Sequence, residues 1–288
     1  MAVMLVSPVA ESILPLLVGV LCFSSQVVHT QQTILFVKTN SGSSCSDDVQ
    51  ISECRTLDWY SNNSNSSFTS NTEMLFQAGI HSLSIFIKVN NCHNFTMTGN
   101  GSALHNSDGQ PQPTSIVYCT GSYNTMSGLY FSNSSNIHVH NLEFRFCSGL
   151  YTMKDSLHQF AGSLIFNSVK DISLDQVVVS NAIGYGLHTS NIFGTNRVLD
   201  SAFSHASKHP TINNSGNAHF YFDKHFSSSH TVLVVKLSWF TYGESEGAAG
   251  GLSVYIHCPS VHVAIVNITT KRNVGANGGN LALSLIHI

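Results

Sequence analysis

Short alternating apolar runs recur along this chain, and this repeat restricts the possible folds more than any other feature. The segment GLYFSNSSNIHVHNLEF, residues 128–144, contains one copy: a short apolar run, a polar pause, and a longer run interrupted by two adjacent polar residues. A period of two buries one face of a strand. The two adjacent polar residues shift the inward side by one position, as a sharp corner between two strands requires.

The longer run fits one template, in which apolar residues stand one, three, six and eight positions after a polar residue. After Asn196 the template places Leu199 inward, and after Thr231 it places Val232 and Val234 inward. Irregular repeats of this length are typical of solenoids whose coils carry loops of variable length. The copies lie 25 to 42 residues apart, and their polar residues are Asn94, Asn136, Asp171, Asn196, Thr231 and Ser260.

We therefore predict an all-β fold, a right-handed parallel β-helix in which each coil contributes about three short strands that pair with the next coil. An antiparallel β-sandwich also consists of short alternating strands and is the alternative. Asn-Gly, a strong hairpin signal, occurs only at Asn100–Gly101 and Asn277–Gly278. The rarity of such signals between the runs favours the β-helix.

The composition limits the partners. Only 9% of the 288 residues are charged, and the formal net charge is -3. Such a chain offers no basic stripe for phosphates, so nucleic acid is not an expected partner. Ser, Asn, Thr and Gly supply most of the polarity, a mixture typical of turns and exposed strand faces.

Residues 1–30 are expected to be an export signal. The run ILPLLVGVLCF, residues 13–23, has the length of a signal-peptide core and is followed by polar residues. It is short for a bilayer span. We expect a secreted protein or the ectodomain of a cell-surface protein, with membrane contact only through an uncleaved signal or a segment that follows Ile288.

Glycosylation sequons and cysteines agree with export. Six cysteines would remain after removal of the signal, and in an oxidising compartment they are expected to form disulfides. Cys45 and Cys54 flank a short loop and are the predicted first pair; among the three pairings of the other four, Cys92 with Cys119 is favoured. The predicted N-glycosylation sites are Asn62, Asn65, Asn94, Asn100, Asn133, Asn213 and Asn267.

The chain from about residue 36 to residue 288 resembles a known group of proteins. Its segments CRTLDWY, LFQAGIHSL and NNCHNFTMTGNGS, together with the repeated GL-x-F and N-I-x-V coils, are similar to those of uncharacterised secreted or ectodomain proteins of animals with a right-handed β-helix of the pectin-lyase-like superfamily. The resemblance implies a cap region over residues 31–83, which includes the Cys45–Cys54 loop. The coils are expected over residues 84–288 and to continue beyond Ile288, because the last apolar run has no polar cap.

Enzymes of that superfamily act on acidic polysaccharides with clustered carboxylates and a basic residue, or with Ca²⁺ held by Asp. In our alignment His140, Asp175 and Asp200 occupy the same template position in successive coils, and stacking would place them about 4.8 Å apart. Such a column can act as general acid and base or bind a metal. Corner residues that hydrogen-bond the backbone are the alternative. The Gly-His-Gly and Arg-Ile-Lys motifs of polygalacturonases are absent from the sequence.

His138 and His140 flank Val139, so both side chains leave a strand on one face, where Zn²⁺ or Cu²⁺ would find two ligands. No third ligand is evident, so no metal site and no cofactor are predicted; Ca²⁺ enters only if the chain is a lyase.

The sequence favours a non-catalytic extracellular recognition or adhesion module whose partner is a glycan or a protein. A polysaccharide lyase or glycoside hydrolase that acts on acidic polysaccharide through His140, Asp175 and Asp200 is one alternative. A structural rod or spacer is the other.

Overall fold

The computed structural model describes residues 32–39, 53–63, 68–120, 128–152, 159–208, 215–223, 230–245, 249–258, 260–276 and 279–285. Residues 1–30, the predicted export signal, lie outside this part of the chain, as do Cys45, Asn65 and Asn213. All described residues belong to one compact unit that spans residues 31–288.

Three long sheets make up this unit. Sheet A has nine strands in the order β2 (Glu53–Thr56), β1 (Thr33–Lys38), β3 (Thr72–Phe76), β6 (His93–Thr98), β11 (Ser135–His140), β15 (Lys170–Asp175), β18 (Gly194–Leu199), β21 (Thr231–Lys236) and β25 (Val261–Val266). Sheet B has seven: β4 (Gly79–Leu83), β9 (Ser115–Cys119), β12 (Leu142–Arg145), β16 (Val178–Ser180), β19 (Ala202–Ser204), β22 (Trp239–Thr241) and β26 (Thr269–Lys271).

Sheet C contains β5 (Phe86–Asn90), β10 (Gly128–Ser132), β14 (Gln159–Asn167), β17 (Tyr185–Ser190), β20 (Gly216–Phe222), β24 (Leu252–Ile256) and β28 (Leu281–Leu285), with β13 (Gly149–Thr152) beside β14. Two short pairs complete the strands: β7 (Leu104–His105) with β8 (Pro111–Gln112), and β23 (Glu244–Ser245) with β27 (Val274–Gly275).

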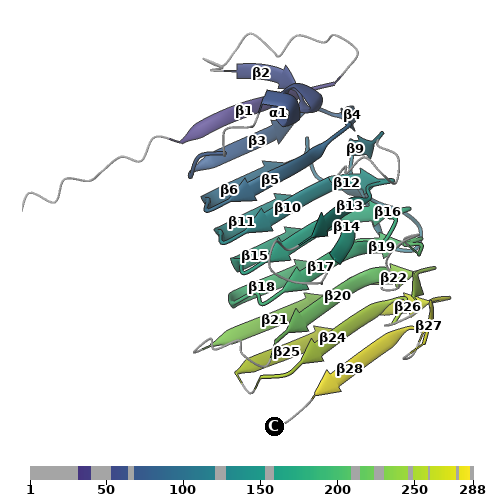
Figure 1. Ribbon diagram of the computed structural model, residues 1–288. Coiled ribbons are helices and arrows are strands. Elements are labelled where there is room, and N and C mark those ends of the chain that lie inside the picture. Colours follow the sequence, from purple (N-terminus) through teal and green to yellow (C-terminus); the bar gives the residue numbers. More distant parts are fainter. Residues whose placement is uncertain are drawn as a thin grey trace, which may run out of the picture. The chain divides into compact units, whose positions relative to one another are not determined.

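The chain visits the sheets in the repeated order C, A, B, and each strand pairs in parallel with the equivalent strand of the next coil (Figure 1). Among the described strands, only β13 with β14 and β7 with β8 pair antiparallel. The fold is therefore all-β with long parallel sheets, as expected of a parallel β-helix. An antiparallel sandwich does not fit this pairing.

Apolar side chains fill the interior coil by coil. The rings of Phe131 and Phe166 are stacked with centroids 4.8 Å apart, and those of Phe203 and Phe240 with centroids 5.4 Å apart. All four side chains are fully buried. Parallel pairing places equivalent residues one strand spacing apart, about 4.8 Å, so like side chains stack along the core.

The structure corrects the template at three copies; the one that starts at Ser260 begins two residues too early, because Leu233 pairs with Val263, and its Val266 is exposed. Sheet A pairs Leu174 with Val198 and Val198 with Val235. The prediction was therefore wrong by one residue for the copies that start at Asn196 and Thr231, because a shift of one residue moves every side chain to the other face. The inward residues of β18 and β21 are Asn196, Val198, Leu233 and Val235, not Leu199, Val232 and Val234.

The shift arises from a polar residue that faces inward. Asn196 is the first residue of β18 whose side chain faces the core, and its exposed fraction is 2%. Its Oδ1 accepts a hydrogen bond from Ile172 N at 3.2 Å, and its Nδ2 donates to Phe193 O at 3.2 Å. These bonds satisfy a polar side chain that faces the core.

Corners between sheets A and B, and between sheets B and C, are each made by one residue in the left-handed backbone region. The backbone amide of Asn141 donates to the carbonyl of Asp175 in the next coil at 3.0 Å, and the other corners repeat this bond except Asn267 and Arg272, which belong to the last of these coils. The A–B corners are Asn141, Gln176, Asp200, Leu237 and Asn267; the B–C corners are Phe146, Asn181, His205, Tyr242 and Arg272.

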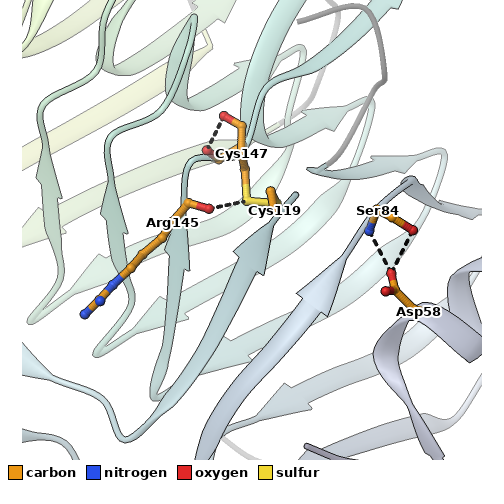
Figure 2. Close-up of a disulfide and its surroundings, with 6 residues drawn as sticks. Asp58, Ser84, Cys119, Arg145 and Cys147 are labelled. Atoms are coloured by element: carbon orange, nitrogen blue, oxygen red, sulfur yellow. Dashed lines mark hydrogen bonds between the residues drawn. A yellow bond between two sulfur atoms is a disulfide. The ribbon is translucent and has the colours of Figure 1, made fainter. Parts of the chain in front are cut away.

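The first strands of sheets A and B lie in the region predicted as a cap, together with helix α1 (Leu57–Asn63). Leu57 and Tyr60 are buried, whereas Trp59 is half-exposed with the Arg55 guanidinium 5.2 Å from its ring centroid. Asp58 Oδ1 accepts hydrogen bonds from Ser84 N at 2.7 Å and Ser84 Oγ at 2.9 Å (Figure 2). This contact ties α1 to the turn between β4 and β5.

A disulfide joins Cys119 to Cys147, with Cα atoms 4.9 Å apart (Figure 2). The predicted Cys92–Cys119 pair is wrong: Cys92 is a free, buried thiol that faces the core. Cys119 ends β9 and Cys147 follows β12, and these strands are neighbours in sheet B, so the two residues meet at one corner. Cys54 is also disulfide-bonded, but the Cys45–Cys54 pairing stays a prediction because Cys45 lies outside the described residues.

Candidate functional site

His140 and Asp175 lie opposite each other in β11 and β15 and point outward from sheet A. Their Nδ1 and Oδ2 atoms are 3.3 Å apart, and each side chain is 40% exposed. Two of the three predicted column residues therefore do meet, as a solvated pair.

Asp200 does not join this pair. The strand position after Asp175 is occupied by Leu199, because β18 is shifted by one residue relative to the template. Asp200 is an A–B corner residue, and its Oδ2 lies 2.9 Å from Nε2 of His105 and 3.3 Å from Nε2 of Gln176. The predicted column of one His and two Asp is thus wrong at its third member.

His105 belongs to residues 99–114, which contain β7 and β8 and which we call the β7–β8 arm. The arm connects β6 to β9 and extends across the coils that come later in the chain. The amide Nδ2 of Asn141 holds the start of the arm by donating to Asn100 O at 2.9 Å. The tip lies beside Trp239 in β22, because a Cβ atom placed on Gly109 would be 3.6 Å from Cζ2 of the Trp239 ring. The arm therefore reaches from the coil of β6 to the coil of β22.

His138 and His140, the pair considered for metal binding, contact different partners. His138 Nε2 lies 2.7 Å from Oδ1 of Asn136, and burial lowers the pKa of His138. His140 instead contacts Asp175. Within the described residues, no group of three or more His, Cys, Asp or Glu side chains is arranged to hold a metal ion.

A buried cluster of His and Tyr side chains lies on sheet C, outside the apolar interior. The ring of Tyr185 stacks on those of His188 and His219, with centroids 5.1 Å and 4.9 Å away. Nδ1 of His219 lies 2.7 Å from Oγ of Ser253 in the next coil. Burial raises the pKa of Tyr185, and the nearby Tyr255 adds to this shift. Alternation alone predicts an exposed outer face here, so the sequence analysis missed this cluster.

The sequence analysis also missed a group of exposed side chains at or beside the B–C corners, which we call the corner ridge; it consists of Tyr118, Phe146, His205, Tyr242 and Arg272, with Asn181 between Phe146 and His205. The rings of Tyr118 and Phe146 are 5.3 Å apart, and His205 stacks on Tyr242 at 4.8 Å with 6° between the planes. The Arg272 guanidinium lies 5.5 Å from the Tyr242 centroid.

The ridge residues are solvent-accessible. Tyr118, Phe146 and Tyr242 are 37%, 43% and 38% exposed. His205 and Arg272 are exposed as well. The register of the structure finds four of them, because each stands five positions after the A–B corner residue of its coil.

Five predicted glycosylation sites fall within the described residues, and all five asparagines are exposed: Asn62, Asn94, Asn100, Asn133 and Asn267. In the described part of the chain no helix is long and apolar enough to span a membrane.

Comparisons with protein-family models, with curated proteins and with solved structures give no match for this chain.

Proposed function

We propose that this chain is a non-catalytic extracellular recognition module on a right-handed, pectin-lyase-like β-helix, and that its corner ridge binds a glycan. The observation that carries the proposal is two pairs of exposed rings, each on neighbouring coils: Tyr118 with Phe146, and His205 with Tyr242. Aromatic faces give a rigid apolar surface for the faces of sugar rings, and a chain of sugars laid along the coils would meet one pair of rings and, beyond the coil of Asn181, the other.

The backbone of the ridge supports an outward role. Phe146, His205 and Tyr242 have φ of 57°, 55° and 57°, a region that bulky residues rarely adopt. Asn181, at the equivalent corner, is a residue type that adopts it readily. The three larger residues cost on the order of 1–3 kcal/mol each. Their rings are exposed, so burial does not offset this cost, and strained positions of this kind cluster at binding sites.

The Arg272 guanidinium adds a charge to the ridge. It lies over the Tyr242 ring, and its Nη1 donates to the Tyr242 hydroxyl at 3.3 Å. A cation beside aromatic rings favours a glycan that carries carboxylate or sulfate groups over a neutral one.

Secretion or an ectodomain location is part of the proposal. The Cys119–Cys147 disulfide supports it, since disulfides persist mainly in oxidising compartments. The proposed partners are extracellular glycans or proteins, and no cofactor is required.

The test measures retention of the purified protein on immobilised acidic and neutral polysaccharides, with and without Ca²⁺, together with chain cleavage. Replacing Phe146, His205 and Tyr242 by Asn keeps a residue suited to the corner and removes the rings. We expect at least about tenfold weaker retention. Leu237→Asn makes the same change at an exposed A–B corner and should leave retention intact. Equal retention of both variants would refute the ridge as the binding site.

The His140–Asp175 contact favours one other function, hydrolysis or lysis of an acidic polysaccharide. Cleavage in the same assay that is lost in Asp175→Asn would establish this function in place of ours. If neither cleavage nor retention is observed on any polymer, a protein partner or a structural rod becomes the better account.

A further inference from the structure

The exposed asparagines of the glycosylation sequons differ in the hydrogen bonds of their side-chain amides. Asn94 Nδ2 donates to Oδ1 of Asn71 in another coil at 2.7 Å, whereas Asn62 Nδ2 donates to the carbonyl of Asp58 within α1 at 2.8 Å. Asn100, Asn133 and Asn267 are exposed, and the structure gives their side-chain amides no hydrogen bond. Nδ2 is the atom that N-glycosylation modifies, so this difference matters for modification.

Asn94 is the middle of three stacked asparagines. Its Oδ1 accepts a hydrogen bond of 2.7 Å from Nδ2 of Asn136, in addition to the bond that its Nδ2 donates to Asn71. All three residues adopt the left-handed conformation, with φ between 55° and 62°. The Asn94 amide therefore points along the stack toward the neighbouring coil.

A sugar on Asn94 would have to fit between coils. Neighbouring coils are about 4.8 Å apart, which leaves no room for a sugar ring beside the bond to Asn71. A glycan there would replace a hydrogen of Asn94 Nδ2 and compete for space with the Asn71 side chain that this atom contacts, which disrupts the ladder on that side. Asn133 and Asn267 instead lie in turns whose side chains are exposed.

We propose that in the secreted protein N-glycans occupy Asn100, Asn133 and Asn267, and that Asn94 stays unmodified although its sequon is intact. Chains that receive a glycan at Asn94 before folding lose the ladder and are retained by the cell. This inference rests on the proposed export, since only exported chains meet the glycosylation machinery.

None of these three glycans lies on the corner ridge. Asn133 lies in the turn from sheet C to sheet A, between β10 and β11. Asn267 is an A–B corner residue, and Asn100 lies beside the A–B corner because its carbonyl accepts from Asn141. These three glycans cover two of the three corners of the coil, and the ridge occupies the third.

The test uses the full chain expressed in animal cells and collected from the medium. Enzymatic removal of N-glycans in ¹⁸O-water marks each occupied asparagine, and mass spectrometry of the peptides reads the marks. We expect marks at Asn100, Asn133 and Asn267 and none at Asn94. Occupancy of Asn94 in most secreted molecules, or absence of glycan from both Asn133 and Asn267, would overturn the assignment.

Two matched variants remove one sequon each at its third position. Thr269→Ala should increase the gel mobility of the secreted protein by one glycan, whereas Thr96→Ala should leave the mobility unchanged. Asn71→Gly retains the left-handed conformation but removes the acceptor for Asn94, so occupancy at Asn94 should appear. Asn71→Asp keeps an acceptor oxygen and should leave Asn94 unmodified. A glycan lost in Thr96→Ala contradicts the proposal.

Failure of export is distinguishable from failure of the assignment. If the chain carries no glycan at all, the proposed export is wrong. The same chain placed behind an added secretory signal then tests the pattern separately, with the same expected marks.

Discussion

The imidazole rings of His188 and His219 lie one above the other in adjacent coils, with centroids 5.2 Å apart and 10° between their planes. Both side chains are buried. Burial lowers the pKa of His219 to about 4, and burial together with the neighbouring His219 lowers the pKa of His188 well below its ordinary value. Both rings are therefore neutral in the folded protein at neutral pH.

This pair predicts that acid destabilises the fold. The unfolded chain binds protons at these histidines as the pH falls below 6.5, whereas folded His219 binds one only near pH 4. Stability should be unaffected above pH 6.5 and should decrease from there to about pH 4. Over this range His219 should lower the unfolding free energy by on the order of 3 kcal/mol. Urea unfolding at pH values across this window measures it.

A matched pair of variants checks the cause. His219→Asn should flatten the dependence of unfolding free energy on pH, and the same change at the exposed His262 is the control for replacing a histidine by asparagine. An unchanged pH dependence in His219→Asn would show that His219 is not responsible.

We expect the side-chain hydrogen bonds of Asn196 to contribute to the unfolding free energy of the protein. Asn196→Ala removes the acceptor for the buried Ile172 amide and one of the two donors to the Phe193 carbonyl, which keeps its bond from Asp171 N. We predict a loss of about 1–3 kcal/mol in unfolding free energy. The neighbouring Thr195→Ala, at an exposed position, should change stability by at most about 0.5 kcal/mol. Equal urea midpoints for the two variants would argue against a structural role for the Asn196 amide.

The Cys119–Cys147 disulfide closes a loop with a sequence separation of 28. Replacing both cysteines by Ala should lower the unfolding free energy by about 3–4 kcal/mol, because the unfolded chain gains freedom. Peptide mapping without reduction should recover Cys119 linked to Cys147 and Cys92 as a free thiol. A peptide that links Cys92 to either of them would contradict the structure.

Asp200 is predicted to hold the β7–β8 arm rather than the fold. His105 and Asp200 are 41% and 23% exposed in their side chains, so their contact is worth at most about 1 kcal/mol. Asp200→Gly keeps the left-handed corner and removes the contact. Hydrogen exchange should become faster in the arm, at the amides of Asn106 and Gly109, while the urea midpoint stays nearly constant. Asp108→Ala, an exposed change on the arm, is the control and should have neither effect.

Apolar alternation predicted the architecture well where the inward positions are apolar. The copies that start at Asn94, Asn136 and Asp171 have the register of the structure: Phe95 pairs with Ile137, and Ile137 with Ile172. At Asn196 the alternation contains a polar residue that faces inward, and pattern reasoning treats such a residue as outward. The error moved Asp200 into a column with His140 and Asp175, which created a candidate site that the fold does not form.

The remaining differences depend on information that strand periodicity does not contain. The Cys92–Cys119 prediction failed because pairing depends on which strands are neighbours at a corner, and spacing left three pairings open. His188 and His219 alternate with inward residues as exposed residues do, so their burial follows from packing on sheet C. The rings of Phe146 and Tyr242 end up in one row because of a backbone conformation that these residue types rarely adopt.

The single-residue corners have a consequence for how this chain can change in length. In five successive coils the B–C corner residue stands five positions after the A–B corner residue, as Phe146 does after Asn141. An insertion or deletion inside that stretch would take a ring out of the row and turn core side chains to solvent. The segments from the B–C corners to sheet C differ in length from coil to coil, so natural insertions and engineered peptide tags belong in those segments.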